Sequence, residues 1–343
     1  MSEQNKPTLP EKLLSALKLH IPLHVIVDHL RAINLKPVKT WDDLSIQHAD
    51  MAEMFEEFLS ETICFGKKRA YVYDVNKDLL PVFDSLFKSE SRWSVLDALA
   101  SSSEQHTFFR SWIDPDFSVI SFCTKREAFE TYLLTKNDLS DGARNEYWRE
   151  HSVVRIQSPV VISAFDSIVF DRKNEIIMVL IDDIRCSMKE DPDVLLSRLF
   201  AYIDVDGTLR AALNPVDLYP CIKEMYSNKS EGIVCQLSFE CGTGALRDEK
   251  LKQGQLDLRD EKYHVKGKEA VGELFPFKLE IAYHPQKFSG LKSELVIGIK
   301  GKKVNNATKS GVFRFEINSQ AGLGELKFCA YRMSLYLNNE QTI

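Results

Sequence analysis

Residues 153–181 read VVRIQSPVVISAFDSIVFDRKNEIIMVLI and hold the clearest strand pattern in the chain. Short apolar runs rich in valine and isoleucine come first, and the turn-forming residues 172–174 separate them from an uninterrupted apolar run, 176–181. Runs of about four to eight such residues between turn formers are typical of β-strands. The stretch therefore predicts strands over residues 153–157, 160–163, 167–170 and 175–181.

The same pattern recurs toward the C-terminus, where apolar runs are divided by Pro285, Gly290 and Gly322. Helices are predicted over 190–202, since Asp191 followed by Pro192 is typical of a helix start, and over 215–228. Successive strands with short separations favour an antiparallel sheet. Further strands are predicted over residues 232–241, 277–283, 294–300, 312–317 and 326–337.

The N-terminal part has mainly helical periodicity, which begins near Glu11. Pro22 is expected to end one helix and start the next, which separates His20 from His24 as candidate metal ligands. The sequence Thr40-Trp41-Asp42-Asp43 is typical of a helix N-cap with an acidic first turn. Short helices are predicted over residues 91–100, 104–112 and 124–136, and strands over 70–75 and 117–123.

These patterns predict an α+β protein, with an α-rich N-terminal part that has a few strands and a mostly antiparallel β-rich C-terminal part. The turn formers NDLSDGAR at residues 137–144 mark the change. We therefore expect an α-rich domain with a small sheet over residues 1–145 and a β-rich domain over 146–343. A length of 343 residues exceeds the usual size of a single core, which agrees with two domains.

Composition is typical of a folded protein, because 44% of the residues are hydrophobic and 10% are aromatic. The seven cysteines, an odd number without a Cys-x-x-Cys pair, favour reduced thiols and a cytoplasmic location. The polar first residues, MSEQNKPTLPEK, lack the apolar core of a signal peptide, so we expect no membrane contact. The net charge of −6 excludes a uniformly basic nucleic-acid binder but allows a local basic patch.

One pair of carboxylates has a spacing with known chemistry. Asp204-Val-Asp206-Gly207-Thr208 resembles the first motif of haloacid-dehalogenase-like phosphotransferases. The resemblance implies a buried parallel strand that ends at Asp204, with Asp204 as phosphoryl acceptor, Asp206 as general acid/base and Mg²⁺ between them. The alternative is a β-hairpin, because Asp206 followed by Gly207 is a strong turn signal. The predicted helix 190–202 leaves few residues for a preceding strand, which favours the hairpin.

A second set of acids lies within residues 246–270. The triplets Asp248-Glu-Lys250 and Asp260-Glu-Lys262 resemble the catalytic half of restriction-type nucleases, in which two acids hold Mg²⁺ and a lysine stabilises the attacking water. Asp260 and Lys262 would then be catalytic. A chain with 27% charged residues also produces such triplets by chance. Charged, solvent-facing strands joined at Gly254 are the alternative.

The strongest local charge lies between His284 and Glu316, where seven lysine and arginine residues against two glutamates give a net charge of +5. Lysines around a loop, with aromatic residues on neighbouring strands, can bind phosphates and stack bases. Lysines on exposed strand edges also prevent aggregation. We expect a basic β surface that binds a partner, formed by Lys287, Lys292, Lys300, Lys302, Lys303, Lys309, Arg314 and Phe313.

Residues 42–61, predicted as one helix, have the opposite charge, with seven carboxylates and no lysine or arginine. A solvated helix face explains such a run, and the alternative is docking of a basic partner or of a second copy. We therefore expect a non-catalytic binding protein without a metal or cofactor. It would self-associate or contact nucleic acid through the basic β surface, with the acidic helix as the opposite contact face. The alternative is a Mg²⁺-dependent phosphoryl-transfer enzyme, phosphatase-like at Asp204 and Asp206 or nuclease-like within residues 248–262.

Overall fold

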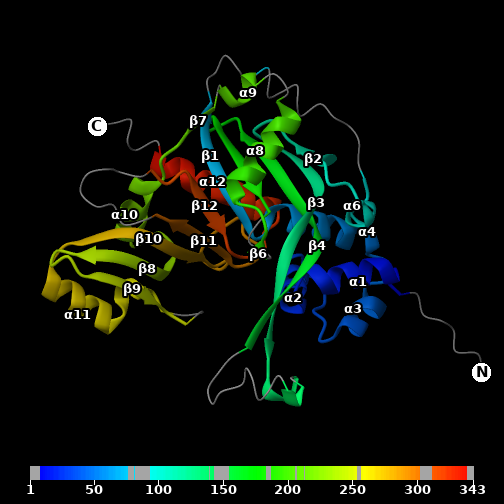
Figure 1. Ribbon diagram of the computed structural model, residues 1–343, viewed down its shortest axis with the longest axis horizontal. Coiled ribbons are helices and arrows are strands. Elements are labelled where there is room, and N and C mark those ends of the chain that lie inside the picture. The colour runs from blue at the N-terminus through cyan, green and yellow to red at the C-terminus, as the bar shows by residue number, and fades with distance from the viewer. Residues whose placement is uncertain are drawn as a thin grey trace, which may run out of the picture.

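Figure 1 shows the computed structural model, which describes residues 8–75, 81, 93–138, 140–142, 154–182, 187–204, 207–211, 213–252, 256–301 and 311–337. The helices are α1 (Glu11–His20), α2 (Leu23–Ala32), α3 (Trp41–Gln47), α4 (Ala52–Phe65), α6 (Val95–Ala100), α8 (Pro192–Ile203), α9 (Thr208–Ala211), α10 (Tyr219–Ser227), α11 (Lys262–Val271) and α12 (Leu323–Leu337), with short 3-10 turns η2 (Lys136–Asp138) and η3 (Leu258–Asp260). The strands are β1 (Lys68–Val75), β2 (Thr107–Ile113), β3 (Phe117–Leu134), β4 (Val154–Asp171), β5 (Ile176–Ile181), β6 (Ser187–Met188), β7 (Leu213–Pro215), β8 (Ile233–Cys241), β9 (Leu246–Lys250), β10 (Leu274–Tyr283), β11 (Leu295–Lys300) and β12 (Arg314–Ile317).

These strands join in one sheet with the order β2-β3-β4-β5-β1-β12-β11-β10-β8-β9, while β6 pairs with β3 and β7 with β1. Each described pairing is antiparallel, which confirms the predicted α+β class. Strands from both sides of the predicted domain boundary alternate in the sheet, because β1 lies between β5 and β12. The boundary at residues 145 and 146 lies outside the described residues, and the division into two domains stays a prediction.

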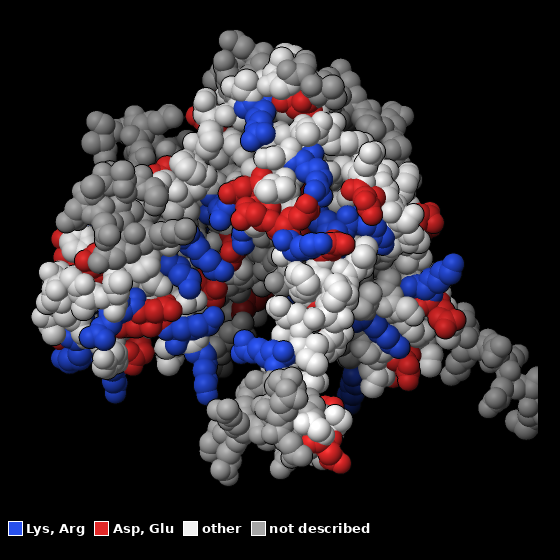
Figure 2. Space-filling view, in the orientation of Figure 1, with Lys and Arg blue, Asp and Glu red and all other residues white. Residues whose placement is uncertain are grey.

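Helices cover the two faces of the sheet unequally (Figure 1). On one face, α1, α4, α10 and α12 pack on the strands in the larger core, which includes Leu17, Phe55 and Met333. On the other face, α8 and α9 cover β1, β5, β4 and β3 in a second core around Leu199. Beyond β1 this second face is polar, and Figure 2 shows basic and acidic side chains interleaved there. By strand alternation its residues are Gln236, Ser238, Lys278, Glu280, Lys300 and Glu316.

The hairpin predicted around residues 206 and 207 is wrong, because the segments on both sides are helical. No strand leads directly into Asp204. α8 runs up to Asp204, and α9 begins at Thr208. Leu195 and Leu199 recur at helical spacing and are buried against the sheet, and α8 continues to Ile203, into the segment that a hairpin would need as its first strand. Residues 205 and 206 lie outside the described chain.

Three other predicted elements change type. Residues 124–134 of the helix predicted over 124–136 are part of β3, because they pair with β4 up to Leu134. The predicted helix over 104–112 is mostly β2, and the predicted strand over 326–337 lies in α12. The helices predicted over 190–202 and 215–228 are confirmed as α8 and α10, although both start later than expected.

α1 and α2 meet at a sharp bend, as Pro22 predicted. α1 ends at His20, and α2 begins after Pro22 at an angle of 105°. His20 and His24 therefore do not share a helix face. Among the described residues no single helix is long and apolar enough to cross a membrane, and only this bent pair meets both criteria when its helices are taken together.

Candidate functional site

The described residues of the predicted basic surface lie in two places. Lys300 and Arg314 are neighbours across β11 and β12 on the polar face, and Phe313, which is 43% exposed, precedes Arg314. Lys287 and Lys292 lie at the opposite end of β11, in the connection from β10. The remaining predicted residues, Lys302, Lys303 and Lys309, lie outside the described chain.

Lys300 and Arg314 both have acidic partners. Lys300 forms an ion pair with Glu316. The Arg314 guanidinium lies 2.8 Å from a carboxylate oxygen of Asp193 and donates a hydrogen bond of 3.1 Å to the Tyr71 hydroxyl. Pairs of this kind contribute little stability, but they cancel the positive charge that phosphate binding needs. The part of the basic surface that Lys300 and Arg314 form is therefore a neutralised patch.

The acidic residues 42–61 form two helices, α3 and α4, because the chain turns between them. Asp42, Asp50 and Glu53 are exposed. Three other carboxylates have partners inside the protein: Glu56 with the Val95 amide, Glu57 with Arg110, and Glu61 with the Leu323 amide. Three of the seven carboxylates of the predicted contact face therefore hold α4 against its neighbours.

Asp204 serves as a helix cap. Its two carboxylate oxygens accept hydrogen bonds of 3.0 and 2.7 Å from the main-chain amides of Leu209 and Arg210, at the start of α9. The sheet around it is antiparallel, whereas the phosphotransferase motif requires a parallel strand before the first aspartate. Asp206 lies outside the described residues. The geometry of Asp204 therefore gives the phosphotransferase hypothesis no support.

The two nuclease-like triplets lie on different elements. Asp248 is on β9, where it accepts hydrogen bonds from Gln236 and Ser238. Asp260 is exposed on η3 and pairs with Lys229, and Lys262 is exposed at the start of α11. The predicted second charged strand is thus wrong. In the described ranges no group of three or more His, Cys, Asp or Glu residues is placed to hold a metal ion.

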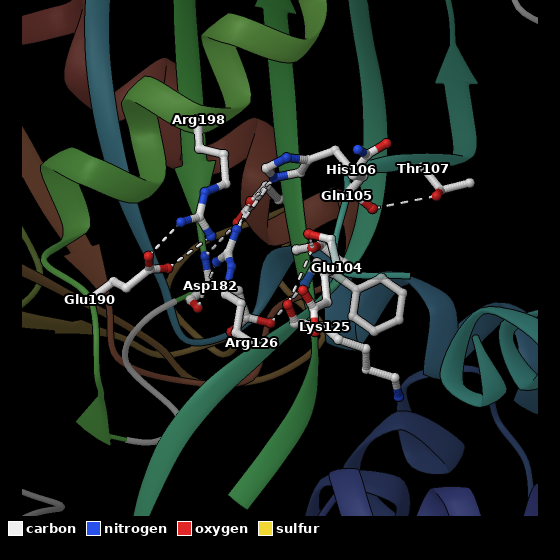
Figure 3. Close-up of polar contacts among 12 residues, drawn as sticks. Glu104, Gln105, His106, Thr107, Lys125, Arg126, Asp182, Glu190 and Arg198 are labelled. Atoms are coloured by element: carbon white, nitrogen blue, oxygen red, sulfur yellow. Dashed lines mark hydrogen bonds and ion pairs between the residues drawn. The ribbon is translucent and has the colours of Figure 1, made fainter. Parts of the chain in front are cut away.

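A buried chain of charges, which the sequence motifs missed, crosses the sheet near the ends of β1 and β5. We call Lys68, Asp182, Asp166, Arg126 and His106 the charged column (Figure 3). The Lys68 ammonium lies 2.9 Å from Asp182 on the side of the larger core. The main-chain amide of Asp182 donates a hydrogen bond of 3.0 Å to the Asp166 carboxylate. On the other side of the sheet, Asp166 pairs with Arg126 and, at 2.8 Å, with His106. Column residues are between 0% and 4% exposed.

The electrostatics of the charged column favour a structural role. Burial alone would raise the pKa of Asp166, but Arg126 and His106 outweigh it and hold this pKa well below its usual value. The neighbouring Cys64 is fully buried, and burial raises the pKa of its thiol to about 12, so it is a poor nucleophile at neutral pH. No substrate can reach groups that are closed to solvent in this way. The column instead ties β1, β3, β4 and β5 together.

Glu231 forms a second buried charge cluster. Its carboxylate is 0% exposed, pairs with Arg332 and accepts hydrogen bonds from the hydroxyls of Tyr283 and Tyr336. Burial and the neighbouring Glu231 charge raise the pKa of Tyr283 well above its usual value, so its hydroxyl stays a donor. This cluster anchors α12 to β10.

The outer parts of β3 and β4 form a two-stranded arm that extends from the body (Figure 1). The strands pair from Phe117 with Asp171 to Leu134 with Val154, so β4 merges three predicted strands into one. In the outer half of the arm, Tyr132 and Ile156 face each other on one side, each 46% exposed. Leu133 lies on the other side and is 64% exposed. We call Tyr132, Leu133 and Ile156 the arm tip.

No protein family matches the chain, and no curated protein matches it either.

Proposed function

We propose that the protein is a non-catalytic interaction protein that self-associates through the arm tip. The observation that carries this proposal is the set of three large apolar side chains exposed on an arm, beside which the described residues form no third layer. A two-stranded ribbon is marginally stable in water, and a partner that covers its apolar side chains stabilises it. A second copy brings the same apolar side chains and the same need for burial.

The other surfaces considered above support this choice. Among the described acids of the two enzyme-like motifs, Asp204 caps a helix, and Asp248 and Asp260 lie exposed on separate elements. Lys300 and Arg314 of the basic surface are paired. A protein contact at the arm tip requires none of these groups. It also explains why large apolar side chains are exposed on the arm.

The test replaces Tyr132, Leu133 and Ile156 together with serine. Each half-exposed side chain contributes about 1 kcal/mol when a partner buries it, and a dimer loses three such side chains from each copy. The variant should therefore associate on the order of ten-thousandfold more weakly. Sedimentation velocity over a concentration series measures the monomer fraction directly.

The matched control replaces two exposed apolar residues outside the arm, Leu246 and Tyr263, with serine. It should associate as the unmodified protein does. A protein that stays monomeric at every concentration, or a control variant that loses association as the arm variant does, would refute the proposal.

A further inference from the structure

The outer edge of β4 at the base of the arm has no strand beside it in the described part of the chain. β5 pairs with β4 only from Ser167 onward. The Phe165 amide points to this edge, where Asp182 accepts its hydrogen bond at 3.0 Å. Because main-chain groups alternate along an antiparallel strand, those of Val161 point to the same edge. Pro159 follows in the same alternation, at an edge position that needs no amide hydrogen.

A groove of about 730 Å³ runs along this edge, between β4 on one side and α1 and α6 on the other. Its apolar lining includes Leu19, Leu99, Val161 and Ile162. Leu19 is 79% exposed and Val161 is 67% exposed, so both present apolar surface to a ligand. We call this cavity the edge groove.

The edge groove is positively charged. Lys12, Lys67 and Lys125 line it, and within the described ranges none of the three forms an ion pair. The Lys125 ammonium donates to neutral acceptors, the Leu99 carbonyl at 3.1 Å and the Ser163 hydroxyl at 2.7 Å. Figure 3 shows its side chain pointing away from Arg126 of the charged column. Glu130 is the one acidic residue in the described lining.

We propose that the edge groove binds an extended acidic peptide segment of a partner protein, which adds to β4 as a further strand. Main-chain hydrogen bonds to β4 would hold the peptide, and its apolar side chains would contact Leu19 and Leu99. Its carboxylates would face the three lysines. A second copy is a poor occupant, because pairing two β4 edges would bring two sets of lysines together. This inference is independent of self-association, since the arm tip is not part of the groove.

The first experiment measures charge recognition by fluorescence anisotropy. The probe is a labelled peptide of about eight residues that alternates glutamate and valine, about 26 Å long when extended. The serine variant of the arm tip serves as the protein, so that self-association does not interfere. The probe should bind, and the double variant Lys12→Glu with Lys67→Glu should weaken binding about tenfold or more. Lys18→Glu, which adds the same charge to α1 outside the groove lining, is the matched control and should change little.

The second experiment tests strand addition. Val161→Pro removes an amide hydrogen that points to the outer edge of β4 and therefore forms no hydrogen bond with β3. Pro159, two residues earlier on the same edge, is a natural proline at an equivalent position. It should reduce binding of the glutamate–valine peptide strongly while the circular dichroism spectrum stays unchanged. As a test that leaves the protein unaltered, methylation of alternate amides in the peptide should have the same effect.

Several results would overturn the proposal. These are absence of probe binding, equal binding of a lysine–valine peptide, and binding that survives amide methylation. If Lys12→Glu with Lys67→Glu in the otherwise unmodified protein changed only its oligomeric state, the occupant would be a second copy and the proposal would be wrong. Loss of self-association in the arm-tip variant bears on the previous proposal alone.

Discussion

Burial of His29 makes the stability of this fold depend on pH. His29 lies on α2, is 8% exposed and stacks on Phe58 with 4.0 Å between the ring centres. Its Nδ1 atom has no hydrogen-bond partner among the described residues. Burial, followed by the nearby Lys292 charge, lowers the pKa of His29 from 6.5 to about 4, although Glu325 acts in the opposite direction.

The direction of the pH effect follows from proton binding. Between pH 6.5 and 4 the unfolded chain binds a proton at His29 and the folded chain does not, so stability falls as the pH falls. At pH 5 the solution is about 1.5 units below the unfolded pKa, and each unit is worth about 1.4 kcal/mol. The folded state is therefore about 2 kcal/mol less stable at pH 5 than at pH 7.5, because the buried His29 ring stays neutral while the unfolded chain binds a proton.

The perturbation that tests this account is His29→Leu, which removes the titrating group and keeps an apolar side chain against Phe58. Urea unfolding at pH 7.5 and pH 5, followed by tryptophan fluorescence, gives the free energy of unfolding for each protein. The unmodified protein should lose about 2 kcal/mol more than the variant over this interval. His24→Leu, on the exposed side of the same helix, should keep the full pH dependence. Equal losses in the unmodified protein and His29→Leu would refute the reasoning.

The buried charges give predictions of graded size. Lys68→Met leaves Asp182 buried without its counter-charge, so we expect a loss of about 3–5 kcal/mol in urea unfolding, and a loss below about 1 kcal/mol would contradict the column's role. Arg332→Met should lower the free energy of unfolding by less, about 2 kcal/mol, because two tyrosine hydroxyls still donate hydrogen bonds to Glu231. A larger decrease in melting temperature for Arg332→Met than for Lys68→Met would contradict this ranking. Asp204→Ala should cost about 1 kcal/mol and speed amide exchange at the start of α9, whereas a variant with unchanged exchange would show that the cap is dispensable.

Features set by neighbours along the chain were predictable. Thr40 forms a capping box with Asp43, Asp191 caps α8 ahead of Pro192, and Pro22 separates two helices. The α+β class followed from strand-like runs in the C-terminal part. In each case the deciding interaction joins residues within one turn of the chain, so its signal is present in a short window of sequence.

Tertiary structure alone decided the features that depend on distant partners. Residues 124–134 contain good helix formers, yet they form a strand because β4 pairs with them along the whole arm. The charged column was invisible in the motifs, because Lys68 and Asp182 are far apart in sequence and meet only when β1 pairs with β5. The edge groove likewise exists only where α1 lies beside β4. A short segment of sequence determines helix and strand propensity and the residues that cap a helix. Which side chains are buried and which charges pair depends on the distant segments that the folded chain brings into contact.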